Sequence, residues 1–407
     1  MLVSNIVPMT LIALLAVPAV SEADILILIQ NAMAAAGLAT LLQTFPIGRI
    51  GSGLPIFMGV SFTFVVPLAA VSSKYGYGAV IGTVLAGGIF EGILGFSAKY
   101  WKRLITPIVS AVVVTGIGLS LLPTAARSFG GGNTPDYGSL INLLIGSATL
   151  LSCILWRIYA KGVHKQLSVL VGLAVGYLLA VITGNVYLHD LLDSGLIAVP
   201  RLLPFQPLFR LDAILSVCVI YLVSATETIG DASALTSGAL GRQISGEEVS
   251  GAIAADGFGS VIAGLFGITP ITSYSENIGI AIMTRVVNRR ITLIGALIMI
   301  AAGFLPPIGI FLSSIPSSVI GGVLLMVMGQ IVVSGFERIA KAGFTPRNKL
   351  IAALSLAFGV GFTTSTEAGI WVNFPVFVQS IFSQNVVAVM FVTALLLNLL
   401  LPKNIEE

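Results

Sequence analysis

Residues 267–277 read Gly267-Ile268-Thr269-Pro270-Ile271-Thr272-Ser273-Tyr274-Ser275-Glu276-Asn277, which places a carboxylate and an amide within an apolar chain. A second run, residues 51–67, has the same mixture of glycine, proline, hydroxyl and β-favouring residues. We expect each run to be partly extended before it turns helical. Irregular backbone at membrane depth is tolerated only where protein or a cavity buries it. These two runs therefore mark the predicted centre of the fold.

The composition around these runs is that of a polytopic membrane protein. Of 407 residues, 56% are hydrophobic and only 9% are charged, whereas soluble domains have about 25% charged residues. Apolar stretches of roughly 17–22 residues recur, each long enough to cross about 30 Å of hydrocarbon as a helix. We predict about fourteen spans, at residues 1–19, 24–43, 52–70, 76–96, 103–121, 138–157, 166–184, 211–229, 248–266, 270–287, 291–313, 316–334, 349–365 and 384–401.

The two irregular runs occupy matching places in the two halves of the chain. One lies in the third span and the other in the tenth, so each belongs to the third span of a set of seven. An odd number of spans inverts the second half relative to the first, and paired broken segments then mark the binding site of an inverted-repeat transporter. The alternative, two unrelated proline-kinked helices, stays open at this point.

The basic residues predict the orientation in the membrane. With the N-terminus inside, sixteen of the 20 Lys and Arg residues, Arg338 among them, fall on the cytoplasmic side. Lys74, Arg127, Arg201 and Arg210 fall outside. This bias follows the positive-inside rule. We therefore predict a multi-pass protein of the cell (inner) membrane with both termini cytoplasmic.

Four acidic residues of the second half lie within or at the edge of predicted spans: Glu227, Asp231, Asp256 and Glu276. Glu227 and Asp231 are four residues apart, so they share one helix face, which we expect to line a cavity. No Lys or Arg is expected at their depth. At least one acid should then be protonated or hydrogen-bonded, as in proton carriers. Acids that cap broken helix ends are the alternative.

The other polar residues favour a solute carrier over an enzyme. Asn277 places an amide beside Glu276, which suits a planar, amide-rich solute. Glu91 is a fifth buried carboxylate, for which we expect a local structural role. His164 and His189 lie in predicted loops without metal-ligand spacing, so neither metal nor cofactor is expected. No nucleophile or extramembrane domain is visible in the sequence, and we predict that the protein is not an enzyme.

Short motifs now identify a resemblance. Glu276-Asn277-Ile278-Gly279 followed by Thr284-Arg285 resembles the signature of the nucleobase-ascorbate transporter family, also called nucleobase:cation symporter 2. Ser61-Phe62-Thr63-Phe64 is similar to the third-span strand of that family, and Val319-Ile320-Gly321-Gly322 to the start of its twelfth span. Arg103-Leu104-Ile105-Thr106-Pro107 is similar to its fifth-span entry, and the similarity covers nearly the whole chain.

The resemblance implies an all-α membrane fold of two inverted seven-span repeats, with short strands in spans 3 and 10. It implies a core domain of residues 1–98 and 209–314 and a gate domain of residues 99–208 and 315–407. Family members usually have a longer start, with a histidine in the first helix. Here Met1 begins within that helix, so the first helix is expected to be truncated at its N-terminus.

The resemblance also implies the site and the activity. The substrate-binding residues carried over are Glu227, Glu276, Asn277, Phe62, Thr63 and Ser275, and those for proton coupling are Glu227, Asp256 and Asp231. The implied protein is a proton-coupled symporter that imports a nucleobase across the lipid bilayer, as a homodimer and without nucleic acid. Residues 227–231 resemble xanthine permeases, which favours xanthine or a related purine. Glu276 resembles uracil permeases, so a uracil permease is the alternative, and an anion exchanger of the same fold is another.

Overall fold

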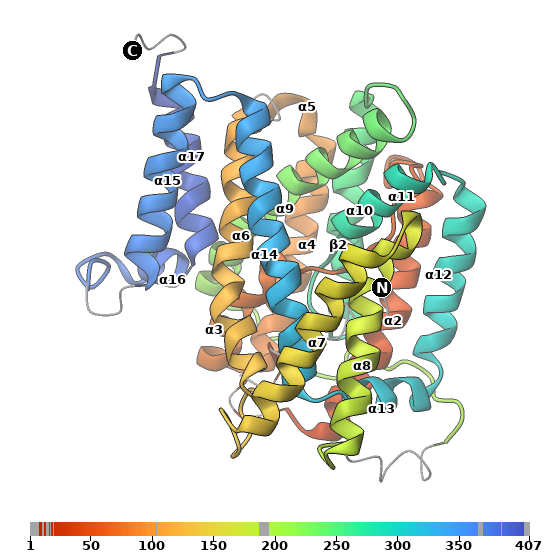
Figure 1. Ribbon diagram of the computed structural model, residues 1–407. Helices are drawn as coiled ribbons and strands as arrows, with labels where there is room; N and C mark the ends of the chain where they lie inside the picture. The colour runs from red at the N-terminus through yellow and green to blue at the C-terminus, as the bar shows by residue number, and fades with distance from the viewer. Residues whose placement is uncertain are drawn as a thin grey trace.

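The computed structural model of the protein describes residues 8–9, 12–13, 16, 18, 20–101, 104–186, 195–364, 369–383 and 385–402. The predicted truncated start of the first helix lies outside these residues, and so do Arg103 and His189. The described chain is a bundle of helices with one small sheet (Figure 1).

The elements of the first half follow the predicted spans from the second to the seventh. They are α2 (Glu22–Thr44), β1 (Met58–Val60), the 3-10 helix η1 (Phe62–Phe64), α3 (Val65–Tyr75), α4 (Tyr77–Phe96), α5 (Ala98–Trp101), α6 (Pro107–Phe129), α7 (Leu140–Tyr159), the 3-10 helix η3 (Gly162–Leu167) and α8 (Ser168–Ile182). The third span is part strand and part helix, as predicted.

The elements of the second half repeat this order. They are α9 (Leu211–Gly238), α10 (Gly246–Leu265), β2 (Ile271–Ser273), α11 (Ser275–Thr284), α12 (Arg289–Gly303), α13 (Pro306–Ser313), α14 (Ser317–Ala342), α15 (Pro346–Thr364), α16 (Val376–Phe382) and α17 (Val386–Leu400). Within the described ranges, seven helices are long and apolar enough to cross a membrane on their own. The tenth span, like the third, combines a strand with a short helix.

The predicted span over residues 291–313 is divided into two helices. The chain bends by 84° between α12 and α13. Pro306 and Pro307 open α13, and proline lacks the N–H that would continue the preceding helix. The residue before a proline is also biased away from the helical conformation, so α12 ends before this pair.

The two irregular runs form one sheet at the centre of the bundle. β1 pairs antiparallel with β2, with Met58 opposite Ser273 and Val60 opposite Ile271. Backbone bonds continue the pairing on both sides: the Ser61 N–H donates to the Pro270 carbonyl at 2.9 Å, and the Tyr274 N–H to the Phe57 carbonyl at 3.0 Å. The alternative of two unrelated kinked helices is therefore excluded.

Hydroxyl groups of neighbouring helices satisfy the outer edges of this sheet. Thr40 on α2 accepts a hydrogen bond from the Met58 N–H at 3.0 Å. Ser260 on α10 donates to the Ile271 carbonyl at 3.2 Å. An unpaired backbone group in a membrane interior costs several kcal/mol, so these two hydroxyls allow strands to exist at that depth.

Close helix packing surrounds the sheet. α4 packs against α9 and α10, and α12 packs against α2. On the other side, α14 packs against α6 and α7, and α15 against α17 (Figure 1). Gly257 on α10 shows how close the contact with α4 is, because a Cβ atom there would lie 2.2 Å from the backbone nitrogen of Gly92. Small residues of this kind let helices approach closely in lipid.

Candidate functional site

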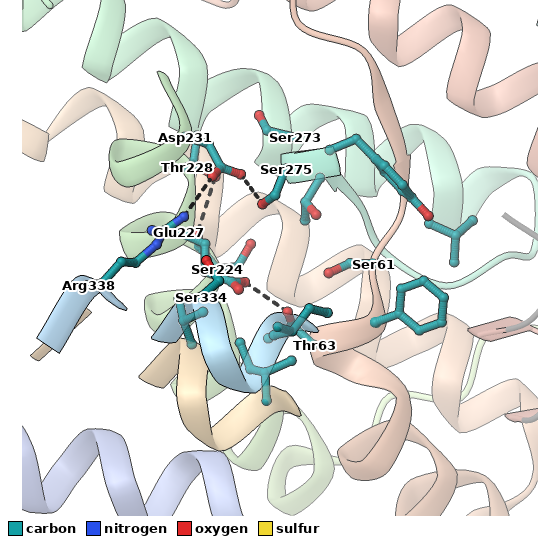
Figure 2. Close-up of a pocket in the computed structure, with 17 residues that line it drawn as sticks. Ser61, Thr63, Ser224, Glu227, Thr228, Asp231, Ser273, Ser275, Ser334 and Arg338 are labelled. Atoms are coloured by element: carbon teal, nitrogen blue, oxygen red, sulfur yellow. Dashed lines mark hydrogen bonds and ion pairs between the residues drawn. The ribbon is translucent and has the colours of Figure 1, made fainter. Parts of the chain in front are cut away.

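A cavity lies where the two strands end and the following helical segments begin. Its empty volume is about 740 Å³, including its open mouth. Polar groups of both halves face it, together with an apolar wall of Val114 and Ile117 from α6 and Ile331 from α14. The polar lining includes Ser61, Thr63, Ser224, Glu227, Asp231, Ser275 and Arg338 (Figure 2).

Glu227 joins the two halves of the cavity lining. Its carboxylate lies on α9 and accepts a hydrogen bond of 2.8 Å from the hydroxyl of Thr63 on η1. Thr63 is buried, whereas Glu227 is only partly buried. Phe62, the neighbour of Thr63, also lines the cavity. Three of the predicted substrate-binding residues thus lie together.

Asp231 lies one turn further along α9 and is almost fully buried. One of its oxygens accepts a 2.5 Å hydrogen bond from the hydroxyl of Ser275, the first residue of α11. The other lies 3.7 Å from a guanidinium nitrogen of Arg338 on α14. The prediction that no basic residue lies at the depth of these acids is therefore wrong.

The position of Arg338 follows from the length of α14. We predicted that this span ends at residue 334, but the helix continues to Ala342 and ends before Gly343, whose φ of 89° is left-handed. Arg338 is therefore one turn of helix beyond Ser334, within α14, and its guanidinium faces α9. Gly230 on α9 leaves it room, since a Cβ atom there would be 3.0 Å from the guanidinium.

Asp256 lies behind the cavity and is not among the residues that line it. One oxygen accepts a hydrogen bond from the hydroxyl of Thr228 on α9. The other accepts from the hydroxyl of Ser273 on β2 at 3.0 Å. Asp256 thereby connects α9, α10 and the sheet, and its carboxylate is fully buried.

The two signature residues differ in what the structure describes of them. The backbone of Glu276 is helical, but its side chain lies outside the described part. Asn277 is partly buried in the first turn of α11, and its backbone N–H donates to the Tyr274 carbonyl at 3.2 Å. Asn277 is not among the described residues that line the cavity.

Four polar residues that line the cavity from α9 and α14 were not predicted from the sequence. Ser224 and Thr228 share the cavity-facing side of α9 with Glu227, and Ser334 and Arg338 face the cavity from α14. Their spacing was the available signal, because residues three or four apart share a helix face. Ser224 is three residues before Glu227, so extending the polar face of Glu227 by one turn toward the N-terminus would have identified it, and Thr228 is four residues beyond Ser224 on the same face.

The arrangement can bind a flat solute that has both donors and acceptors. Glu227 offers acceptors, and Arg338 and the hydroxyl groups offer donors. α11 begins at the cavity, and a helix N-terminus favours negative partial charge. Within the described residues no group of three or more His, Cys, Asp or Glu side chains could hold a metal ion.

Comparison with known families agrees with this geometry. Residues 1–368 match the model of a xanthine/uracil permease family, described as "Permease family". A putative purine permease of Clostridium perfringens is 32% identical over 378 residues, which cover 93% of this chain and 83% of the relative. Uric acid permease PucJ of Bacillus subtilis is 33% identical over 375 residues, with coverage of 89% and 82%.

A third relative and two solved structures extend the comparison. Xanthine permease XanQ of Escherichia coli is 32% identical over 394 residues, covering 92% of this chain and 83% of the permease. The transmembrane domain of the cyanobacterial bicarbonate transporter BicA has a TM-score of 0.59 at 15% identity, covering 95% and 94% of the two chains. The murine anion transporter Slc26a9 has a TM-score of 0.64 at 12% identity, covering 96% of this chain and 65% of that one. These two likenesses concern the inverted-repeat fold alone.

Proposed function

This chain belongs to the xanthine/uracil permease family, and from that membership we propose that it is a proton-coupled symporter that imports xanthine or a related purine. The coarser conclusion, a multi-pass membrane transporter of nucleobases and not an enzyme, follows from the family and its relatives. The purine preference is supported by the names of the relatives, which are permeases for purines, xanthine or uric acid.

The observation that carries the proposal is the position of Glu227 in the central cavity. A carboxylate can accept two parallel hydrogen bonds from adjacent ring N–H groups, and each charged bond contributes about 1.5–3 kcal/mol. Thr63 holds this carboxylate from the opposite half at 2.8 Å. We propose that Glu276 is a second ligand of the base, and that Asn277 orders the start of α11.

The carbonyl oxygens of a purine need donors, and the cavity offers several. Phe62 and Ser275 begin helical segments, and the first N–H groups of a helical segment lack acceptors within it. Arg338 lies at the same cavity and keeps about a third of its side-chain surface exposed. A cationic group there also suits a purine that carries a negative charge, such as urate.

Proton coupling is supported by the position of Glu227 on a buried helix face beside Asp231. We propose that Glu227 exchanges the coupling proton, with Asp231 and Asp256 as relay groups. Protonation removes the charge that binds the ring N–H groups, so proton and substrate binding become linked. Coupling follows if only the loaded or the empty core moves past the gate.

We propose the core domain as residues 1–98 and 209–314 and the gate domain as residues 99–208 and 315–407. This division is supported by the packing of α4 against α9 and α10, and of α6 against α14. The Asp231–Arg338 ion pair would then cross the boundary between the domains. We also propose an inner-membrane location with cytoplasmic termini and a homodimer through the gate domain.

Uptake of labelled xanthine into cells that lack their own purine permeases tests the function. Unlabelled urate, guanine, hypoxanthine and uracil are added as competitors, with and without a protonophore. We expect a purine to compete best and the protonophore to abolish accumulation. Competition by uracil alone would instead identify a pyrimidine permease, and accumulation that persists with the protonophore would contradict proton coupling.

A further inference from the structure

Glu91 differs from the other buried acids of the described chain because its carboxyl oxygens make no hydrogen bond of regular geometry there. It lies on α4, and its side chain is fully buried. Neither carboxyl oxygen makes a hydrogen bond within the described residues. Asp231 and Asp256, by contrast, each have both oxygens paired with a hydroxyl or guanidinium group.

The surroundings of Glu91 are closely packed. The α4 helix lies so near α10 that a Cβ atom at Gly88 would be 2.7 Å from the Gly257 carbonyl oxygen. The hydroxyl of Ser224 on α9 lies beside the Glu91 carboxyl. Ser224 also lacks a hydrogen-bond partner among the described residues, and it lines the cavity one turn before Glu227. Ser224 thus separates Glu91 from the cavity.

These contacts decide which acid can store a proton. Hydroxyl and guanidinium donors offset part of the cost of burying a carboxylate, and Asp231 and Asp256 have such partners on both oxygens. An ionised carboxylate without partners is very costly to bury, and the group takes up a proton instead. Glu91 is the fully buried acid of the described chain that lacks such donors on both of its oxygens.

The charged and titratable groups around Glu91 act in the same direction. Asp256 faces it from α10, and Glu227 and Tyr221 face it from α9. On the other two helices packed on α4, Lys74 and Tyr75 of α3 contact Asp212 near the start of α9, and Lys99 of α5 lies over the Tyr100 ring. No cation among these neighbours would hold Glu91 in its charged form.

We propose that Glu91 is a second proton site of the transporter, which holds the coupling proton while Glu227 binds the base as a carboxylate. The inference rests on the proposed proton-coupled function and resolves a conflict within it. Glu227 cannot accept two ring N–H bonds and carry the coupling proton at the same time. A proton stored behind the cavity can travel with the substrate.

The transfer balances through Ser224. While the base is bound, Glu91 is the neutral acid and Glu227 is the carboxylate. When the base leaves, the O–H bond of Glu91 breaks and its proton passes to the Ser224 oxygen, while the proton of the Ser224 hydroxyl passes to a carboxyl oxygen of Glu227. Ser224 is unchanged, and Glu227 releases the proton into the cavity. Uptake of a proton through the same groups restores neutral Glu91 before the next base binds.

Accumulation and exchange of labelled xanthine in proteoliposomes test the proposal. Glu91→Gln keeps the shape of the neutral acid but cannot release a proton. One coupled proton concentrates substrate about tenfold per unit of pH gradient. We expect Glu91→Gln to lose this accumulation while counterflow exchange stays close to that of the wild type. Thr83→Val is the matched control, since Thr83 is on α4, is fully buried and has no hydrogen-bond partner for its hydroxyl in the described part of the chain. This variant should keep both activities.

The outcomes separate this proposal from the proposed function. If the wild type accumulates xanthine and Glu91→Gln accumulates it equally well, the proposed role of Glu91 is overturned. Proton coupling itself would still stand in that case. A wild type that shows exchange but no gradient-driven accumulation overturns proton coupling itself. If Glu91→Gln shows no exchange, Glu91→Asp decides, because it retains a carboxyl group. Accumulation in Glu91→Asp supports the proposal, and exchange without accumulation overturns it.

Discussion

The two halves of the cavity share a scaffold but differ in charge. In the first half Thr40 supports β1, and in the second half Ser260 supports β2. The acids that line the cavity in the described structure, Glu227 and Asp231, both come from the second half. Repetition therefore fixes where the strands lie, while the second repeat supplies the acids that line the cavity.

Among the substitutions that test this difference between the halves, loss of Glu227 should have the largest effect on transport. In Glu227→Gln the site loses a charged acceptor for two ring N–H groups, each bond contributing about 1.5–3 kcal/mol. We expect apparent xanthine affinity to fall about 100-fold or more, as measured by concentration-dependent uptake. Thr63→Ser, which keeps the hydroxyl that contacts Glu227, is the control from the first half and should retain most uptake. Equal losses of xanthine affinity in both variants would contradict the conclusion that the second half supplies the charged group that binds the base.

Breaking the pair of Asp231 and Arg338 should have the next largest effect. Asp231→Asn leaves the guanidinium without its carboxylate, at a cost of about 1–2 kcal/mol because Arg338 is partly exposed. Such a change corresponds to about a 5–30-fold loss, which uptake rates at low substrate concentration would measure.

A double-mutant cycle provides the control for that pair. The variant Asp231→Asn with Arg338→Gln removes both charges, so it should recover part of the activity lost in the single variant. Strictly additive losses would show that the two side chains act independently.

Substitutions of the hydroxyl residues at the sheet edges should have the smallest effects on transport, and the effects should be similar in the two halves. Thr40→Val and Ser260→Ala each remove one hydroxyl from a sheet edge, at about 1 kcal/mol of stability. We expect similar shifts in thermal unfolding in detergent for both variants, with little change in substrate preference. A large difference between them would contradict an equivalent scaffold in the two halves.

Much of the fold could be predicted from the sequence because the membrane constrains it strongly. Length and apolarity located the spans, and glycine, proline and hydroxyl residues located both strands. The bend before Pro306 was missed because the apolar stretch continues through it without a polar break. A hydropathy profile shows the length of an apolar stretch but not a change in the direction of the helix axis.

The residues of the site could be predicted only where a charged side chain interrupts an apolar stretch of sequence. Glu227 and Asp231 are conspicuous in an apolar helix, and their shared face follows from spacing. Arg338 was missed because its partner Asp231 lies on another helix, and because the positive-inside rule already explained a basic residue near the end of a span. Glu91 was predicted to be structural; its lack of partners became visible only from the packing of α4 against α9 and α10.

The central claim is that a carboxylate of the second half couples the base to a proton. The most direct test adds xanthine to proteoliposomes and follows the internal pH without any imposed gradient. We predict that xanthine entry carries protons inward in the wild type and in Thr63→Ser, and that Glu227→Gln abolishes this proton movement. Proton movement of unchanged size per xanthine in Glu227→Gln would contradict the claim.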